Sequence, residues 1–125
     1  MTENELSHKI IGLAIEVHRH FGPGLLESAY EQALVYELRQ AGFDVKTQCC
    51  IPYTYKKLKI ETAFRADVIV NDLVILELKS VKDLDSAYFS RTLTYLRLTG
   101  HKLALLINFN VKMLKDGIHR IVNDL

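Results

Sequence analysis

Residues 67–79 read Asp-Val-Ile-Val-Asn-Asp-Leu-Val-Ile-Leu-Glu-Leu-Lys, and the fold is decided in this stretch. It contains two short apolar runs separated by Asn71-Asp72, a pattern that predicts two strands joined by a turn. The second run is apolar on successive residues, which suits a central strand covered on both faces. Charged side chains are rarely buried unless they are paired or bind a metal ion. The candidate functional residues are therefore the charged ones at the ends of these runs, Asp67, Glu77 and Lys79.

The relative position of the two carboxylates depends on the turn over residues 71–73. Side chains alternate between the faces of a strand, so Glu77 and Lys79 share a face. A two-residue loop would place Asp67 opposite Leu76, on the other face from Glu77. A three-residue loop or a bulge would bring both carboxylates and Lys79 to one side. The hypothesis of a metal site therefore requires an odd loop or a bulge, and a plain two-residue hairpin would exclude it.

Two facing carboxylates would suit a hard divalent cation, Mg2+ or Mn2+, with the Leu78 carbonyl and waters completing the coordination. The metal would polarise a phosphodiester and lower the pKa of a bound water. Lys79 could orient that water and counter the charge of the transition state. In the alternative interpretation, Glu77 and Lys79 form an ion pair at the strand end and Asp67 caps a turn. The spacing alone leaves both interpretations open.

The rest of the chain predicts helices and strands around this hairpin. Apolar residues recur at helical spacing in three segments, and β-branched or aromatic runs lie between turn residues. Helices are predicted over residues 6–21, 26–41 and 84–99, and strands over residues 45–55, 58–70, 74–79, 103–109 and 117–122. The order α-α-β-β-β-α-β-β predicts an α/β fold, a mixed central sheet flanked by helices with one β-α-β crossover. We expect one domain over residues 1–125, because no repeat or linker divides the chain.

Composition limits the function without identifying it. The net charge of +1 does not by itself favour nucleic-acid binding. Lysines nevertheless cluster at the predicted turn that contains Lys56 and Lys57, although such clusters are also typical of solvated faces. We expect a cytoplasmic protein without membrane association. The N-terminus carries acidic residues where a signal peptide carries basic ones, and no apolar stretch is long enough to cross a bilayer.

The cysteines and histidines show no pattern of metal ligands. Cys49 and Cys50 are adjacent, which makes a structural disulfide between them implausible. His18 and His20 lie two residues apart on the first predicted helix and face different directions. We interpret both as surface or cap residues.

Two motifs in the chain resemble those of a known superfamily. Arg65-Ala66-Asp67, then nine residues, Glu77-Leu78-Lys79 and a helix resemble the PD-(D/E)XK nuclease motif. Residues 24–30, Gly-Leu-Leu-Glu-Ser-Ala-Tyr, are similar to the signature of the GxxExxY proteins, a small branch of that superfamily. The resemblance implies a restriction-endonuclease-like core. It also implies Asp67 and Glu77 as metal carboxylates, Lys79 as the catalytic lysine and Glu27 as a further acid at the metal.

Physical chemistry is compatible with this role of Glu27, which lies near the positive end of a helix dipole, but an acid there can also simply stabilise the helix. Tyr30 is interpreted as a core residue with its hydroxyl at the rim. Arg91 and Tyr95 stand where related nucleases often carry a glutamine and a tyrosine. An arginine could bind a phosphate, but it lacks the mixed donor and acceptor character of an amide. The candidate contacts with nucleic acid are Arg91, Tyr95, Lys56 and Lys57.

The favoured function is a Mg2+-dependent nuclease that hydrolyses phosphodiester bonds by metal-activated water, with DNA favoured over RNA. The alternative is a catalytically inactive module with the nuclease fold that binds nucleic acid or a partner protein. The costly strand carboxylates favour the enzyme, whereas the near-neutral charge and Arg91 favour the module. A chain of this size has little surface for sequence recognition, so we expect a homo-oligomer or a partner protein.

Overall fold

The computed structural model describes the backbone of residues 1–125 and all side chains except those of residues 62 and 63. The predicted order of helices and strands is confirmed, with one short 3-10 helix added. The helices are α1 (Glu3–Phe21), α2 (Glu27–Gln40), α3 (Ser86–Thr99) and the 3-10 helix η1 (Leu114–Asp116). The strands are β1 (Val45–Tyr55), β2 (Leu58–Val70), β3 (Val74–Lys79), β4 (Leu103–Asn108) and β5 (Ile118–Val122).

Local sequence explains where the first helix begins and ends. The hydroxyl of Thr2 accepts a hydrogen bond from the backbone of Glu5, and the Glu5 carboxylate accepts one from the backbone of Thr2. This reciprocal pair satisfies donors that a helix start leaves free. Gly22 ends α1 with a φ of 69°, a conformation that costs glycine less than other residues.

The five strands form one mixed sheet in the order β1-β2-β3-β4-β5. β3 and β4 are parallel, and the other neighbouring strands are antiparallel. α3 connects β3 to β4, so the predicted crossover is present. β3 therefore lies at the centre of the sheet, and the charged residues at its end lie between helical layers.

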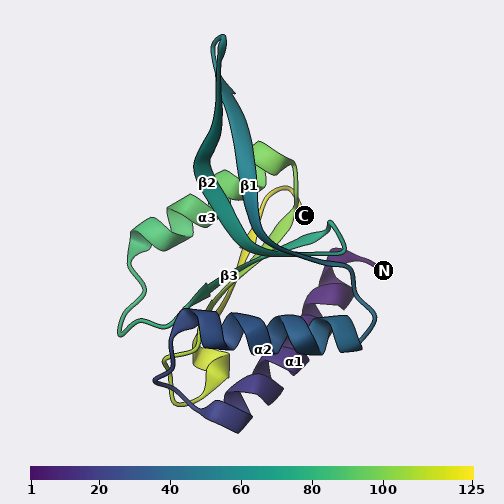
Figure 1. Ribbon diagram of the computed structural model, residues 1–125, viewed down its shortest axis with the longest axis vertical. Helices are drawn as coiled ribbons and strands as arrows, with labels where there is room; N and C mark the ends of the chain where they lie inside the picture. Colours follow the sequence, from purple (N-terminus) through teal and green to yellow (C-terminus); the bar gives the residue numbers. More distant parts are fainter.

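Helices cover both faces of the sheet, with α1 and α2 in the lower half of the molecule and α3 in the upper half (Figure 1). Val74, Leu76 and Leu78 of β3 belong to the hydrophobic cluster formed with α1 and α2. Ile75 belongs to a second cluster formed with α3. This alternation accounts for the continuous apolar run of β3. It also assigns Glu77, two residues after Ile75, to the face that α3 covers.

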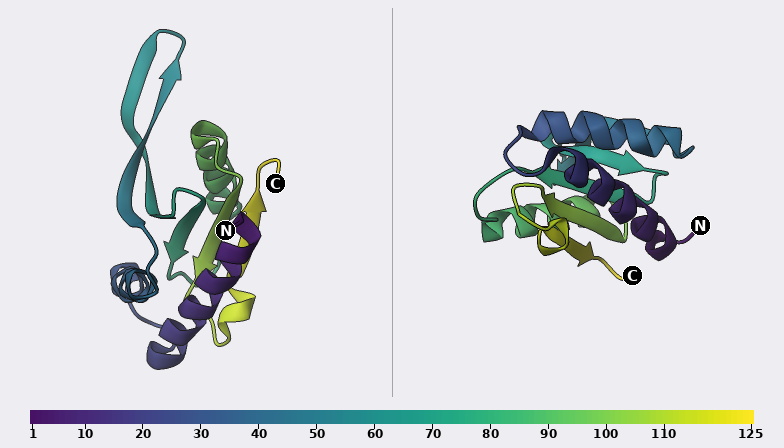
Figure 2. Two further views of the ribbon diagram at one scale, coloured as in Figure 1. Left: turned by 90° about the vertical axis from the view of Figure 1, so that its right-hand side faces the viewer. Right: turned by 90° about the horizontal axis from the view of Figure 1, so that it is seen from below.

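The outer part of the β1–β2 hairpin extends beyond the helices as a two-stranded arm (Figures 1 and 2). Tyr55 pairs with Leu58, and Lys56-Lys57 form the connecting turn, as predicted. The pairing shifts between Ile51 and Tyr53, an irregularity of the kind that bends a ribbon. We call residues 53–60 the arm tip. Both strands were predicted, but their departure from the body was not.

The position of His18 corrects its interpretation as a surface or cap residue. Its side chain is buried, and its Nε2 atom lies 2.8 Å from the carbonyl oxygen of Val111. The segment after β4 thus meets the last turns of α1, a long-range contact that helical spacing does not reveal. Within the described chain, no helix combines the length and hydropathy needed to cross a membrane.

Candidate functional site

Residues 71–73 form the three-residue loop on which the metal-site hypothesis depends. Val70 pairs with Val74, which leaves three residues between the strands. Asn71 and Asp72 adopt φ values of 52° and 51°, and short polar side chains tolerate this left-handed region better than most. The plain two-residue hairpin that would have excluded the site is therefore absent from this turn.

Asp67 and Glu77 meet where β2 and β3 separate. The backbone pairing ends at Val68 and Leu76, and the two acids follow at the next position in register. Glu77 Oε1 accepts a hydrogen bond from the backbone of Asp67 at 3.1 Å. Asp67 Oδ2 accepts one from the backbone of Leu78 at 2.8 Å. Side-chain oxygens thus replace ladder hydrogen bonds, and these reciprocal bonds fix the two carboxylates against each other.

Burial is the main cause that raises the pKa of both acids. Glu77 is 5 % exposed, and desolvation, followed by the charge of Asp67, raises its pKa from 4.5 to about 8. Desolvation also raises the pKa of Asp67, against the opposing effects of the Leu78 hydrogen bond and the Lys79 charge. These two acids resist ionisation in the absence of a metal. A cation bound between them would favour their ionised, carboxylate forms.

Two positively charged side chains lie on the α3 side of the carboxylate pair, and both contact the same aromatic ring. Lys79 Nζ is 4.8 Å from the ring centroid of Tyr88, and Arg91 Cζ is 5.9 Å from it. Both charges act to lower the pKa of Glu77. Arg91 is exposed, so its guanidinium is accessible to a phosphate beside the pair.

Tyr30 fixes the loop that leads into α2. Its side chain has no exposed surface, and its ring stacks on Phe109 with centroids 4.4 Å apart. Its hydroxyl donates to the carbonyl of Gly22 and accepts from the backbone of Leu25. The interpretation of Tyr30 as a core residue is confirmed, and its hydroxyl has a defined structural role.

The same loop holds the residue that follows Lys79. Ser80 Oγ donates to the carbonyl of Leu25 at 2.6 Å, and the Ser80 backbone donates to Glu27 Oε1 at 3.4 Å. Glu27 therefore reaches the end of β3, and its charge contributes to the raised pKa of Asp67. Its carboxylate is at the same time engaged by the backbone of Ser80.

Two further residues beside the pair were not predicted from the sequence. Gln48 lies opposite Asp67 with a φ of 50°, and its amide donates to Glu31 at 2.8 Å. A side-chain hydrogen bond from Gln48 also acts to lower the pKa of Asp67. Burial, followed by the charge of Asp67, raises the pKa of Glu31. The four-residue spacing from Glu27 is a signal that could have identified Glu31, whereas no sequence signal indicates Gln48.

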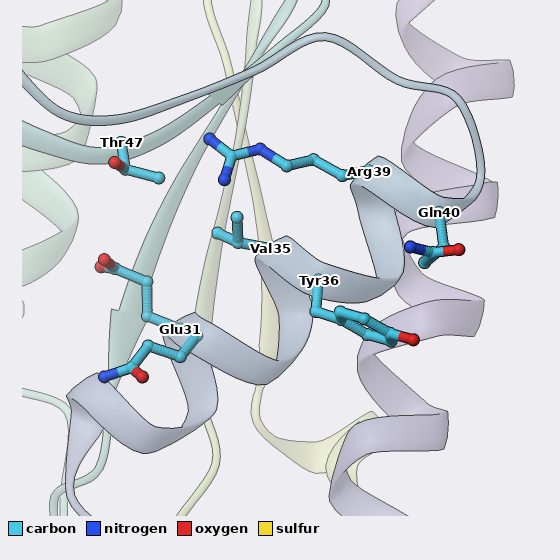
Figure 3. Close-up of a pocket in the computed structure, with 7 residues that line it drawn as sticks. Glu31, Val35, Tyr36, Arg39, Gln40 and Thr47 are labelled. Atoms are coloured by element: carbon cyan, nitrogen blue, oxygen red, sulfur yellow. The ribbon is translucent and has the colours of Figure 1, made fainter.

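Glu31 also lines a pocket of about 400 Å³ between α2 and β1 (Figure 3). Figure 3 shows its carboxylate directed toward Thr47 of β1, with Val35 and Arg39 further along the helix. The Arg39 guanidinium donates to the carbonyl of Val45 at 3.2 Å, which ties the far end of the pocket to β1. Glu31 thus lies between the pocket and the acidic pair.

The four predicted contacts with nucleic acid occupy three different environments. Arg91 lies exposed beside the pair, whereas Lys56 and Lys57 lie in the turn of the arm tip. Tyr95 is only 4 % exposed and packs edge-on against Phe64 at 5.6 Å. The ring of Tyr95 thus packs on the sheet side of α3, which leaves little of its surface for contact with a substrate, and its role in binding stays a prediction.

The donor set at the pair fits a hard divalent cation that keeps water among its ligands, as Mg2+ does. Asp67 and Glu77 offer carboxylate oxygens close together at the end of buried strands. Among the described side chains, no group of three or more His, Cys, Asp or Glu residues is arranged to hold a metal ion. Glu27 and Glu31 therefore do not close a site in this conformation, and coordination by the Leu78 carbonyl stays a prediction.

The mixed sheet is flanked by helices and carries two acids and a lysine at the end of its central strands, an arrangement consistent with a restriction-endonuclease-like fold. A family model described as the PD-(D/E)XK nuclease superfamily matches residues 4–121. The chain belongs to this superfamily, which indicates nuclease-type activity. Proteins of this superfamily generally use divalent metals. No curated protein and no solved structure matches the chain.

Proposed function

We propose that this protein is a Mg2+-dependent nuclease that hydrolyses a phosphodiester bond at Asp67 and Glu77. The reciprocal hydrogen bonds between the two acids and the facing backbone carry this proposal. They hold two costly carboxylates together at the point where the strands separate. A strand-end ion pair between Glu77 and Lys79 would not account for this arrangement.

The residues around the pair have separate roles in this reaction. When bound, the cation would polarise the phosphodiester and lower the pKa of a water. Asp67 and Glu77 would hold it through carboxylate oxygens. Lys79 shares a strand face with Glu77, and its ammonium would offset negative charge that develops on the phosphate. Arg91 would bind a neighbouring phosphate oxygen.

The contacts of Gly24, Glu27 and Tyr30 support placement in the GxxExxY branch. Gly24 adopts a φ of 101° in the loop that Tyr30 holds at Gly22 and Leu25. That loop and Glu27 bind the residue after Lys79, so the motif positions the end of β3 beside the carboxylate pair. We propose DNA rather than RNA as the substrate, and a cytoplasmic homo-oligomer or complex with a partner protein.

A cleavage assay tests the proposed function. Purified protein is incubated with single-stranded and double-stranded DNA and RNA, with Mg2+, with Mn2+ and with a chelator. We expect cleavage only with a metal, and a loss of at least about a hundredfold in Asp67→Asn and Lys79→Ala. The matched controls Asp116→Asn and Lys115→Ala change the same residue types on the exposed η1 segment, and they should retain the rate within about twofold.

Two results would contradict the proposal in different ways. Cleavage that persists in both Asp67→Asn and Lys79→Ala would come from another site or from a contaminant. An absence of cleavage, together with no Mn2+ binding in calorimetry, would leave the catalytically inactive binding module as the function.

A further inference from the structure

The arm tip concentrates positive charge that the composition of the whole chain conceals. Lys56, Lys57 and Lys59 lie within it, and residues 53–60 contain no acidic residue. All three lysines are exposed. The chain as a whole carries only +1, so this short segment is strongly basic against a nearly neutral body. Such a cluster attracts a polyanion even when the net charge does not.

The arm tip also exposes large apolar side chains beside these lysines. Tyr55 and Leu58, the last pair of the hairpin, are each 60 % exposed. Lys56 Nζ lies 5.5 Å from the centroid of the Tyr55 ring. Ile51 and Phe64 still pack in the cluster beneath α3, whereas the tip lies further out (Figure 2). A two-stranded ribbon alone is marginally stable in water, so this segment has much to gain from a ligand.

We propose that the arm tip enters the major groove of a DNA duplex and anchors a double-stranded substrate, an inference that rests on the proposed nuclease function. Strands in a ribbon lie about 4.8 Å apart, so the ribbon fits the B-DNA major groove, which is about 12 Å wide. Lysines around the turn face the phosphates at the groove edges, and Tyr55 and Leu58 offer apolar contact to bases. The narrow major groove of an RNA helix excludes such a ribbon.

The length of the arm sets the length of the duplex. Gln48 lies opposite Asp67, and Tyr55 lies seven residues further along β1. At about 3.3 Å per residue, the tip lies at most roughly 23 Å from the carboxylate pair. This distance corresponds to about seven base pairs at roughly 3.4 Å each. A substrate must therefore extend about seven base pairs from the reacting phosphate before the arm tip can hold it.

Binding without metal tests the anchor independently of cleavage. Fluorescence anisotropy follows a labelled DNA duplex of about 30 base pairs in chelator over a salt series. Lys56→Gln, Lys57→Gln and Lys59→Gln combined should weaken binding about 10- to 100-fold at low salt. The slope of log K against log salt should fall by roughly 2 to 3. A control with Lys9→Gln, Lys112→Gln and Lys115→Gln, exposed elsewhere, should bind within about twofold of the unchanged protein.

A series of duplexes tests the reach of the arm. For the unchanged protein, affinity should rise once the duplex extends more than about seven base pairs beyond the phosphate held at Asp67 and Glu77. The arm-tip variant should show no such rise. Melting curves serve as the control for folding. All variants should fold, because these exposed substitutions leave the core intact.

The outcomes separate this proposal from the nuclease function. Equal binding by the arm-tip variant and the control would overturn the anchor, as would equal losses on single-stranded DNA, duplex RNA and duplex DNA. Light scattering that shows a dimer lost only in the arm-tip variant would make the arm a contact between copies instead. Arm-dependent duplex binding without any cleavage would support the anchor and count against the nuclease.

Discussion

Glu77 interrupts a strand whose other buried residues are apolar, and its surroundings determine when it can ionise. The residue is 5 % exposed, and its carboxylate accepts a hydrogen bond from the Asp67 backbone. Without a cation, burial and the neighbouring acid favour the protonated form. The ionised form needs a compensating positive charge. The residue therefore couples the stability of the fold to pH and to metal.

We expect the metal-free protein to lose stability as the pH rises from 4.5 to about 8. Over this window the folded Glu77 keeps its proton while the unfolded chain has released it. The folded state thus binds more protons, and the free energy of unfolding falls with rising pH. Urea unfolding at several pH values in chelator measures this slope. Glu77→Gln should flatten it and Glu16→Gln, on the exposed side of α1, should not; a wild-type slope of the opposite sign would refute the prediction.

The site residues on β2 and β3 could be predicted because charges in apolar strands are costly and stand out. The loop length could not, since Asn71-Asp72 suits either a two-residue or a three-residue turn. Helical spacing related Arg91 to Tyr95 but could not say how much of each the sheet covers. Gln48 has a positive φ within β1, a backbone conformation that the strand pattern of the sequence does not indicate.

At the scale of elements, the end of β3 is held by its neighbours on both sides. The Asn108 side chain accepts from the Val81 backbone nitrogen and donates to the Val81 carbonyl. The Asn108 backbone in turn donates to the carbonyl of Gly117 at 2.8 Å. A Cβ added at Gly117 would overlap the carbonyl oxygen of Asn108. The residue that leads into β5 therefore approaches the end of β4 so closely that only glycine fits there.

Two glycine substitutions should change stability in opposite directions. Gly117→Ala must push β5 away from Asn108 and should cost about 1–3 kcal/mol. Gly12→Ala lies on the exposed side of α1, where an added Cβ meets nothing within 4 Å. It should stabilise the protein by roughly 0.5–1 kcal/mol, because alanine favours a helix interior. Circular dichroism melts measure both changes in stability. Equal effects would show that the close contact between residue 117 and the Asn108 carbonyl does not limit stability.

The whole molecule joins a packed body to a thin arm, and the carboxylate pair lies where they meet. The element order, the crossover and both layers of helices could be predicted from hydrophobic spacing. That the β1–β2 hairpin extends beyond the helices could not, because Val45 to Tyr55 shows the same strand pattern along its whole length. How much of each strand the helices cover depends on how the helices pack in the folded protein.

Divalent cation should stabilise the whole molecule by mass action. Mn2+ at about a hundred times its dissociation constant would raise the free energy of unfolding by about 2.7 kcal/mol. At a fixed Mn2+ concentration the gain should be larger at pH 8 than at pH 5, because protons compete with the cation for Glu77. Thermal melts with and without Mn2+ measure it. Asp67→Asn should abolish the shift and Asp116→Asn should keep it; a shift retained in Asp67→Asn would place the cation elsewhere.

Because the arm leaves the body beyond the pair, its length is independent of core packing. Side chains on a ribbon repeat every second residue, so adding two residues to each strand leaves every later side chain on its original face. Each such step moves the turn outward by about 7 Å, or roughly two base pairs. Adding one residue to each strand would instead turn the lysines to the opposite face. Related chains can therefore lengthen or shorten their footprint in discrete steps while the reacting centre stays unchanged.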